Sequence, residues 1–252
     1  MRPLKVPEEE IRFAAKTGFL RRSFWEEFYG SDSKSWRSRQ WRSFVDNKFF
    51  LPHPSALAKD VLVPNPRNAF VKRLVGAEIS APPFVAQLEH DSIVARILFL
   101  LSREQVIQNF TTEAELKRRH QDDRQWVDRS EKLKFPDAIL TIANAETSFN
   151  VALEVELTVK SQKRYRKILE VYQDRKQVRA VLFVINSSGI FKAISKAMKE
   201  ARYPDWQKPI GFGRNDEWSV DPVAAPILFR ERTVSMKTIV GLLPKMATRA
   251  PI

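Results

Sequence analysis

The most constraining feature of the sequence is the order of segments between residues 134 and 186. Two aliphatic segments, KFPDAILTI and SFNVALEVELT, flank a polar turn at 144–147, and this pattern predicts an antiparallel β-hairpin. A helical pattern follows at about 161–176, and the segment AVLFVIN then predicts a buried strand. This order of elements predicts an α/β (α+β) domain with a mixed sheet flanked by helices.

The second segment of the hairpin carries two acidic residues in alternation. Glu154 and Glu156 are two positions apart, so a strand points both side chains to one face, while their aliphatic neighbours point to the other. Asp137 lies at the start of the partner strand, so the hairpin can bring three carboxylates together. Such hard oxygen ligands suit Mg²⁺ or Mn²⁺. Lys160, at the strand–helix junction, is placed to neutralise phosphate charge or to position a water.

The helix that follows begins with a cluster of basic residues. Its apolar residues recur on one face, which predicts a helix packed on the sheet with a cationic outer edge. On this edge we expect Lys163, Arg164 and Lys167 to contact a DNA backbone. A structural alternative involves Lys160, Lys163 and Arg164: without a metal they would hold Glu154 and Glu156 in an ion-pair network, because a buried charge needs a partner.

Residues 1–80 predict a winged helix-turn-helix domain. A proline followed by three glutamates begins the first helix, and the polar segment SDS offers N-cap residues for the third. Two short apolar segments then predict the strands of a wing. The helices are expected at about 7–18, 22–29 and 34–47, the wing strands at 49–51 and 61–63, and the wing tip at 52–59.

The third of these helices is rich in cations. In a winged helix this element enters the major groove, where Arg and Gln side chains reach base edges. Two alternatives remain open: the cations simply solvate an ordinary helix, or the module is an adaptor whose wing contacts a protein. The residues expected to contact DNA are Lys34, Arg37, Arg39, Gln40, Arg42 and Lys48.

The positive charge is concentrated at the two ends of the chain. The net charge of +13 divides into +6 for residues 1–80, −3 for 81–160 and +10 for 161–252. Basic patches attract polyanions because neutralised phosphates release counterions. The pattern therefore favours a nucleic-acid partner over a merely solubilising surface, and it leaves the acidic residues in a middle segment between two basic ones.

The composition excludes several classes of protein. There is no cysteine, so disulfides, thiol nucleophiles and cysteine-ligated metals are ruled out, and only three histidines are present, far apart in the sequence. Seven glycines do not form a phosphate-binding loop. The sequence has neither a signal-peptide pattern nor an apolar run of the roughly 20 residues that a membrane span needs. We therefore expect a soluble, cytoplasmic protein with no membrane partner.

The segment order and its acidic residues resemble the PD-(D/E)XK nuclease-like superfamily, whose fold is that of restriction endonucleases. The matching pieces are Pro136 with Asp137, the strand ALEVELT with Glu154, and a preceding helix that carries Glu113 and Glu115. This resemblance implies that Asp137 and Glu154 are metal ligands. It also implies that Glu113 or Glu115 is an accessory ligand.

The sequence departs from that superfamily at one position. The usual lysine, two residues after the second acid, is replaced by Glu156. Some members carry the lysine on the following helix, so Lys160 or Lys163 is a candidate for its role. The alternative is a degenerate site that no longer cleaves.

A narrower resemblance covers residues 8–200. The order of a winged helix, a helix that begins His90-Asp91-Ser92-Ile93-Val94, an acidic helix, and then PD and ExE motifs resembles the replication-relaxation family. That family occurs on plasmids and other mobile elements and has a nuclease-like C-terminal domain. The resemblance implies proteins of a replication or transposition assembly as partners.

These observations predict two domains, a DNA-binding domain at 1–80 and a nuclease-like domain at 81–252. The expected function is binding of double-stranded DNA during replication, mobilisation or processing of a mobile element. If the protein is an enzyme, it is a Mg²⁺- or Mn²⁺-dependent endonuclease: Asp137 and Glu154 hold the ion, Glu156 assists as ligand or base, and Lys160 stabilises phosphate charge. The alternative is a non-catalytic DNA-binding regulator or assembly protein.

Overall fold

The computed structural model describes residues 5–28, 32–55, 57–76, 78–119, 134–143, 148–200, 208–229 and 232–242. The chain divides into two compact units, Met1–Ala95 and Arg96–Ile252. The polar composition of residues 122–131 predicts a loop. This segment and the hairpin turn expected at 144–147 lie outside the described residues.

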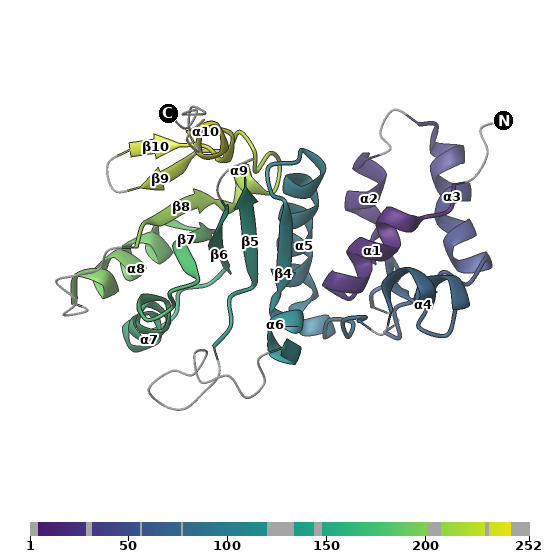
Figure 1. Cartoon of the computed structure of the whole chain (residues 1–252), viewed down its shortest axis with the longest axis horizontal. Helices are drawn as coiled ribbons and strands as arrows, with labels where there is room; N and C mark the ends of the chain where they lie inside the picture. The colour runs from purple at the N-terminus through teal and green to yellow at the C-terminus, as the bar shows by residue number, and fades with distance from the viewer. Residues whose placement is uncertain are drawn as a thin grey trace, which may run out of the picture. The chain divides into compact units, whose positions relative to one another are not determined.

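The first unit combines short helices with a small antiparallel sheet of strand order β1-β3-β2 (Figure 1). The three predicted helices and the two predicted strands are present, whereas β1 and α4 were not indicated by any pattern. Tyr29, expected at the end of the second helix, lies outside the described residues. The elements are α1 (Glu8–Thr17), β1 (Leu20–Arg21), α2 (Arg22–Phe28), α3 (Lys34–Asp46), β2 (Phe50–Pro52), β3 (Val61–Pro64), α4 (Ala69–Val75) and η1 (Val85–Gln87).

The core of the first unit is aromatic. Trp25 of α2 is fully buried, with ring centroids 5.3 Å from Trp41 and 5.4 Å from Phe44, both on α3. Its indole N–H donates to the buried Glu10 carboxylate of α1 at 3.2 Å. Since buried aromatic rings contribute large apolar areas, these contacts hold α3 against α2 by its inner face and leave its outer face exposed.

The second unit is built on a seven-stranded mixed sheet of order β10-β9-β8-β7-β6-β5-β4. Strands β6, β7 and β8 are parallel and the other neighbours are antiparallel. The strands are β4 (Asn109–Thr112), β5 (Ala138–Ala143), β6 (Ser148–Glu156), β7 (Val178–Ile185), β8 (Ile210–Arg214), β9 (Ile227–Phe229) and β10 (Arg232–Val234). The helices are α5 (Leu88–Arg103), which spans the division between the units, α6 (Glu113–Arg119), α7 (Gln162–Gln173), α8 (Ser188–Glu200), α9 (Asn215–Trp218) and α10 (Met236–Leu242).

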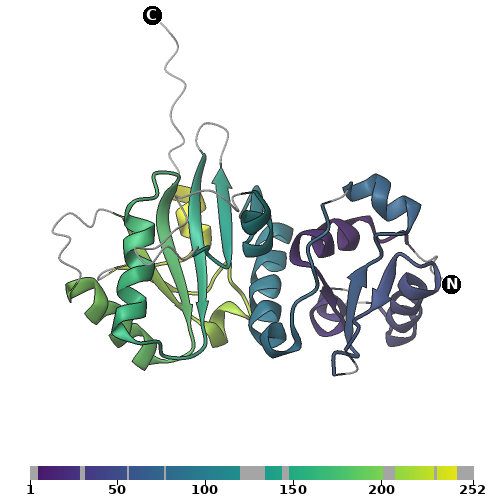
Figure 2. The ribbon, with the colours of Figure 1, turned by 90° about the horizontal axis from the view of Figure 1, so that it is seen from below.

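The predicted order of strand, strand, helix and strand is confirmed by β5, β6, α7 and β7. The apolar sequence at 106–110 predicts a strand, but β4 begins later, at Asn109, and pairs with β5. Helices α7 and α8 pack along one face of the sheet (Figure 2) and enclose a core with Ala152, Val181 and Phe183. This is the face to which Glu154 and Glu156 belong.

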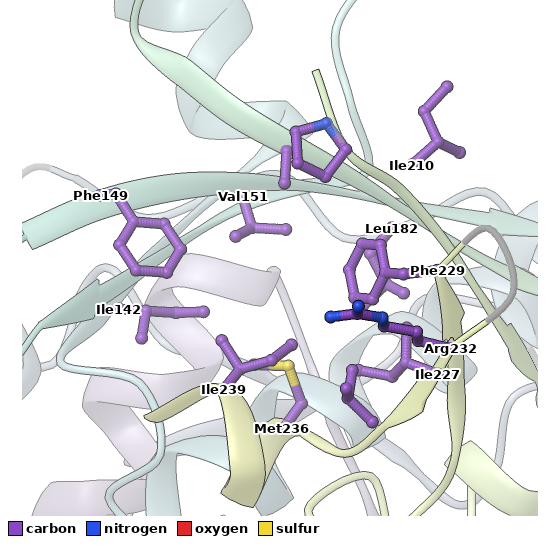
Figure 3. A pocket seen from close by; sticks show the side chains of 13 residues that line it. Ile142, Phe149, Val151, Leu182, Ile210, Ile227, Phe229, Arg232, Met236 and Ile239 are labelled. Atoms are coloured by element: carbon purple, nitrogen blue, oxygen red, sulfur yellow. The ribbon is translucent and has the colours of Figure 1, made fainter. Parts of the chain in front are cut away.

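The opposite face of the sheet borders an apolar cavity of about 840 Å³ beneath β10 and α10 (Figure 3). Its lining includes Phe149, Val151 and Leu182 from the sheet and Met236 from α10, with Arg232 the charged residue among them. Val151 and Leu182 alternate with Ala152 and Val181, so the cavity and the acidic pair lie on different faces. In the part of the chain that the structure describes, none of the helices is both long and apolar enough to cross a membrane.

Candidate carboxylate centre and basic surfaces

The two acids of β6 are buried deeply within the second unit. Glu154 and Glu156 are each 1% exposed, and they pair in register with Phe183 and Ile185 of β7. The predicted alternation places them on one face, but it did not indicate that both faces of this strand are buried, as is usual for parallel strands. Each of these carboxylates therefore requires a partner inside the fold.

Glu154 is held by two side chains. The Tyr172 hydroxyl of α7 donates to its Oε1. The Lys134 Nζ lies 3.0 Å from Oε1 and 3.1 Å from Oε2, so the ammonium faces both carboxylate oxygens. Burial, and to a smaller extent the nearby Asp137, raise the pKa of Glu154 to about 7 against the opposing effect of Lys134.

Lys134 is the residue of this centre that sequence reasoning missed. Its Nζ also donates to its neighbour's carbonyl, Phe135 O, at 2.8 Å, and its own carbonyl accepts from the Arg175 guanidinium at 2.8 Å. Arg175 is 1% exposed and lies over the Tyr172 ring. Burial disfavours the ammonium of Lys134, but Glu154 and Asp137 outweigh this effect and its pKa is raised. The available signal was a lysine three positions before the aspartate in KFPD.

Glu156 has a different partner, Lys160. The Lys160 Nζ lies 2.5 Å from Glu156 Oε1, and its backbone N–H donates to the Tyr165 hydroxyl at 3.2 Å. Burial raises the pKa of Glu156, and Lys160 opposes that rise. Lys160, which was expected to stabilise phosphate charge, is thus the counter-ion of Glu156, the buried acid that replaces the usual lysine of the superfamily.

Asp137 lies immediately before β5, where its Oδ2 accepts the Val155 backbone N–H at 2.6 Å. It raises the pKa of both strand glutamates, so it is near enough to interact with each. Within the described ranges, no group of three or more His, Cys, Asp or Glu side chains is placed to hold a metal ion. Mg²⁺ keeps several waters and needs only one or two carboxylates besides substrate phosphates, so the oxygen chemistry of Asp137 and Glu154 is compatible with this ion.

The glutamates of α6 have local roles. Glu115 accepts from the Thr112 backbone N–H at 3.0 Å while Thr112 Oγ1 accepts from the Glu115 N–H at 3.4 Å, which is a capping box at the start of the helix. Glu113 forms an ion pair with Lys117 at 2.9 Å. The sequence TTEAE therefore begins a helix, and the carboxylate of Glu115, predicted as an accessory metal ligand, caps α6. The Glu113 backbone N–H donates to Asp137 O at 3.0 Å.

The cations of α3 differ in their surroundings. Lys34 and Arg42 are exposed, as is Lys48 just after the helix, and Arg39 is half-buried. At about 3.6 residues per turn, Lys34, Arg39 and Arg42 share the outer face of α3. Arg37 lies toward the inner side and donates to the Asp32 carbonyl.

Gln40 was expected to contact bases, but the structure places it in the interior. It is 2% exposed, its Nε2 donates to the Lys5 carbonyl at 2.7 Å and its Oε1 accepts the Lys5 N–H at 3.0 Å. Both ends of the amide are therefore used to hold the chain before α1. The prediction that Gln40 contacts bases is therefore wrong, because its side chain is buried and both amide groups are bonded within the protein.

A second basic surface lies on α7. Its inner face buries Tyr165 and Tyr172, as the apolar pattern predicted. Its other side presents Lys163 and Arg164, both exposed, and the half-buried Lys167. Arg166 is also exposed and extends this surface, although sequence reasoning did not include it.

Comparison with known proteins gives little. No family model matches the chain, and no curated protein matches it. Among solved structures, a weak likeness is found to the restriction endonuclease FokI bound to DNA, with a TM-score of 0.26 and 8% sequence identity. The likeness covers 84% of this chain and 42% of the FokI chain, so this chain spans less than half the length of the FokI chain. At this TM-score the likeness carries no argument about fold or function.

Proposed function

We propose that the chain binds double-stranded DNA, with residues 1–80 as a winged helix-turn-helix domain. The observation that carries the proposal is the division of α3 into two faces. Trp36, Trp41 and Phe44 hold its inner face, while cations occupy the outer face. A helix fixed in this way can present positive charge to a groove without disturbing its own packing.

The basic surface of α7 supports the same proposal from the second unit. Lys163 and Arg164 are exposed and Lys167 is half-buried on this surface. They would contact phosphates, which requires charge but no particular base sequence. The family resemblance noted above would place this DNA on a plasmid or another mobile element. Partners would then be proteins of its replication, mobilisation or transposition assembly.

The dependence of DNA affinity on salt tests this proposal. Each neutralised phosphate of a duplex releases counterions and contributes about −0.9 to the slope of log K against log salt concentration. We expect a slope steeper than about −2.7, because at least three exposed cations of α3 and its C-terminal end meet phosphates. Fluorescence anisotropy of a labelled duplex measures it. A flat slope would show that these cations only solvate the surface.

A second candidate function is metal-dependent cleavage of phosphodiester bonds at Asp137 and Glu154. The observation that favours it is the clustering of these two acids with Lys134 at one point of the sheet. A bound Mg²⁺ or Mn²⁺ would polarise the phosphate and lower the pKa of a water. In the chain itself, Tyr172 would orient Glu154 and the Val155 N–H would orient Asp137. The opposing non-catalytic alternative is favoured by the internal counter-ions that Glu154 and Glu156 already have.

Nicking of supercoiled DNA in the presence of Mn²⁺ decides between these alternatives. Loss of one metal ligand removes several kcal/mol of transition-state stabilisation, so Asp137→Asn and Glu154→Gln are each expected to slow nicking more than about 100-fold. Glu200→Gln is the control, because Glu200 lies on α8 in an exposed ion pair with Lys196. Nicking that survives both site variants would point to a contaminant or another site, and no nicking by the unaltered chain would favour the non-catalytic alternative.

A further inference from the structure

The Glu154 carboxylate is already paired with the Lys134 ammonium, which conflicts with a metal ion bound to the same oxygens. The Lys134 ammonium lies within 3.1 Å of both oxygens of this carboxylate. A divalent ion bound to the same oxygens would be only a few ångströms from that ammonium, and like charges at such a distance repel strongly in a partly buried site. Lys134 and a metal ion therefore cannot both use Glu154 in this arrangement.

Of the two members of the pair, Lys134 is the one able to leave. Its side chain is 24% exposed, against 2% for that of Glu154, and it is a long flexible chain whose other Nζ contact is the carbonyl of its own neighbour. Glu154 is instead fixed by its strand and by the Tyr172 hydroxyl, while Arg175 fixes the Lys134 backbone. The backbone is thus anchored and the ammonium can swing toward solvent.

We propose that Lys134 and a divalent cation are alternative counter-ions of Glu154, and that a DNA phosphate decides between them. A backbone phosphate at the site gives the Lys134 ammonium a new partner and frees Glu154 for the metal. This inference rests on the second function proposed above. It adds an order of binding, because the metal binds tightly only when DNA is present. Lys134 would then contact the phosphate, the role that Lys160 cannot fill while it is paired with Glu156.

Such an exchange has a thermodynamic signature that does not require cleavage. If DNA raises the affinity for Mn²⁺ by some factor, Mn²⁺ must raise the affinity for DNA by the same factor. We expect a factor of at least about ten in the unaltered chain. In Lys134→Gln, which keeps a hydrogen-bond donor but loses the charge, Mn²⁺ should bind at least about ten times more tightly without DNA, and the effect of DNA should nearly vanish.

The experiment measures free Mn²⁺ by electron paramagnetic resonance during titration of the full chain, with and without a nuclease-resistant duplex whose own Mn²⁺ binding is subtracted. Lys196→Gln is the charge-matched control, because it removes one charge from an exposed ion pair with Glu200 on α8 and should leave the DNA effect intact. Thermal melting shows whether each variant is folded. The effect of DNA on Mn²⁺ affinity is also measured in the unaltered chain, so that part of the test does not depend on any variant.

The outcomes separate the two proposals. Mn²⁺ binding that is unaffected by DNA in the unaltered chain, or that is no tighter in Lys134→Gln, overturns the exchange but leaves a metal site standing. Absence of Mn²⁺ binding in every chain, with and without DNA, removes both the metal site and the exchange. DNA binding as such is judged independently by the slope of the salt titration.

Discussion

Replacing Lys34, Arg42 and Lys48 together by glutamine is expected to weaken duplex binding about 500-fold at 0.1 M salt. All three side chains are exposed on or just after α3. If each neutralises one phosphate, their loss removes about 2.7 from the slope of log K against log salt concentration, which is about 2.7 decades of affinity at 0.1 M relative to 1 M. Anisotropy titrations over a range of salt concentrations measure both quantities.

The control for this prediction has the same change in net charge at another place. Lys192, Lys196 and Lys199 are exposed on α8, and their replacement by glutamine also removes three charges. If affinity depends on the outer face of α3, this second triple variant should lose less than about tenfold, through the weaker long-range field alone. Equal losses in the two variants would mean that DNA binding is not localised to α3.

The strands and long helices were predictable because their apolar residues recur with a definite period. The alternation in VALEVE set the face of Glu154, and the spacing of Tyr165, Ile168 and Tyr172 set the inner side of α7. Strands β1 and β10 were not predicted, because two or three residues are too few to show a period. Such short strands form only because a neighbouring strand already offers its hydrogen-bonding edge.

The partners of the acids were harder to predict than their positions. Lys160 lies four residues from Glu156, so local sequence indicated that pair. Lys134 lies twenty residues from Glu154, and only the pairing of β5 with β6 brings them together. The burial of Gln40 against the Lys5 backbone is likewise a long-range contact. By contrast, the capping box of Thr112 and Glu115 is a local contact between residues three apart, with the pattern T-x-x-E.

The second large effect is expected for stability, from Lys134→Met. This change leaves the Glu154 carboxylate buried without its counter-ion, and breaking a buried ion pair in this way costs several kcal/mol. Because Lys134 is about a quarter exposed, we expect the lower end of that range, a loss of about 3 kcal/mol in the free energy of unfolding at pH 8. Urea unfolding followed by circular dichroism measures the loss.

The loss should shrink as the pH falls. Burial raises the pKa of Glu154 from the ordinary value of 4.5 to about 7, and removal of Lys134, which lowers it, raises the pKa further. At pH 5 the carboxyl of the variant is then protonated in the folded chain while it is mostly ionised in the unfolded chain. Folding therefore takes up a proton, and the penalty of an unpaired buried charge is relieved at pH 5 and largest at pH 8.

A double variant shows whether the cost comes from the unpaired charge. Replacing both partners by apolar residues, in Lys134→Met with Glu154→Leu, removes the buried charge and should restore most of the stability lost at pH 8. The double variant should also lose the pH dependence of the single variant, because the titrating group is gone. If Lys134→Met costs less than about 1 kcal/mol at both pH values, Lys134 does not neutralise Glu154 in solution. Glu154 would then be open to a metal without any exchange, and DNA would have no lysine to displace.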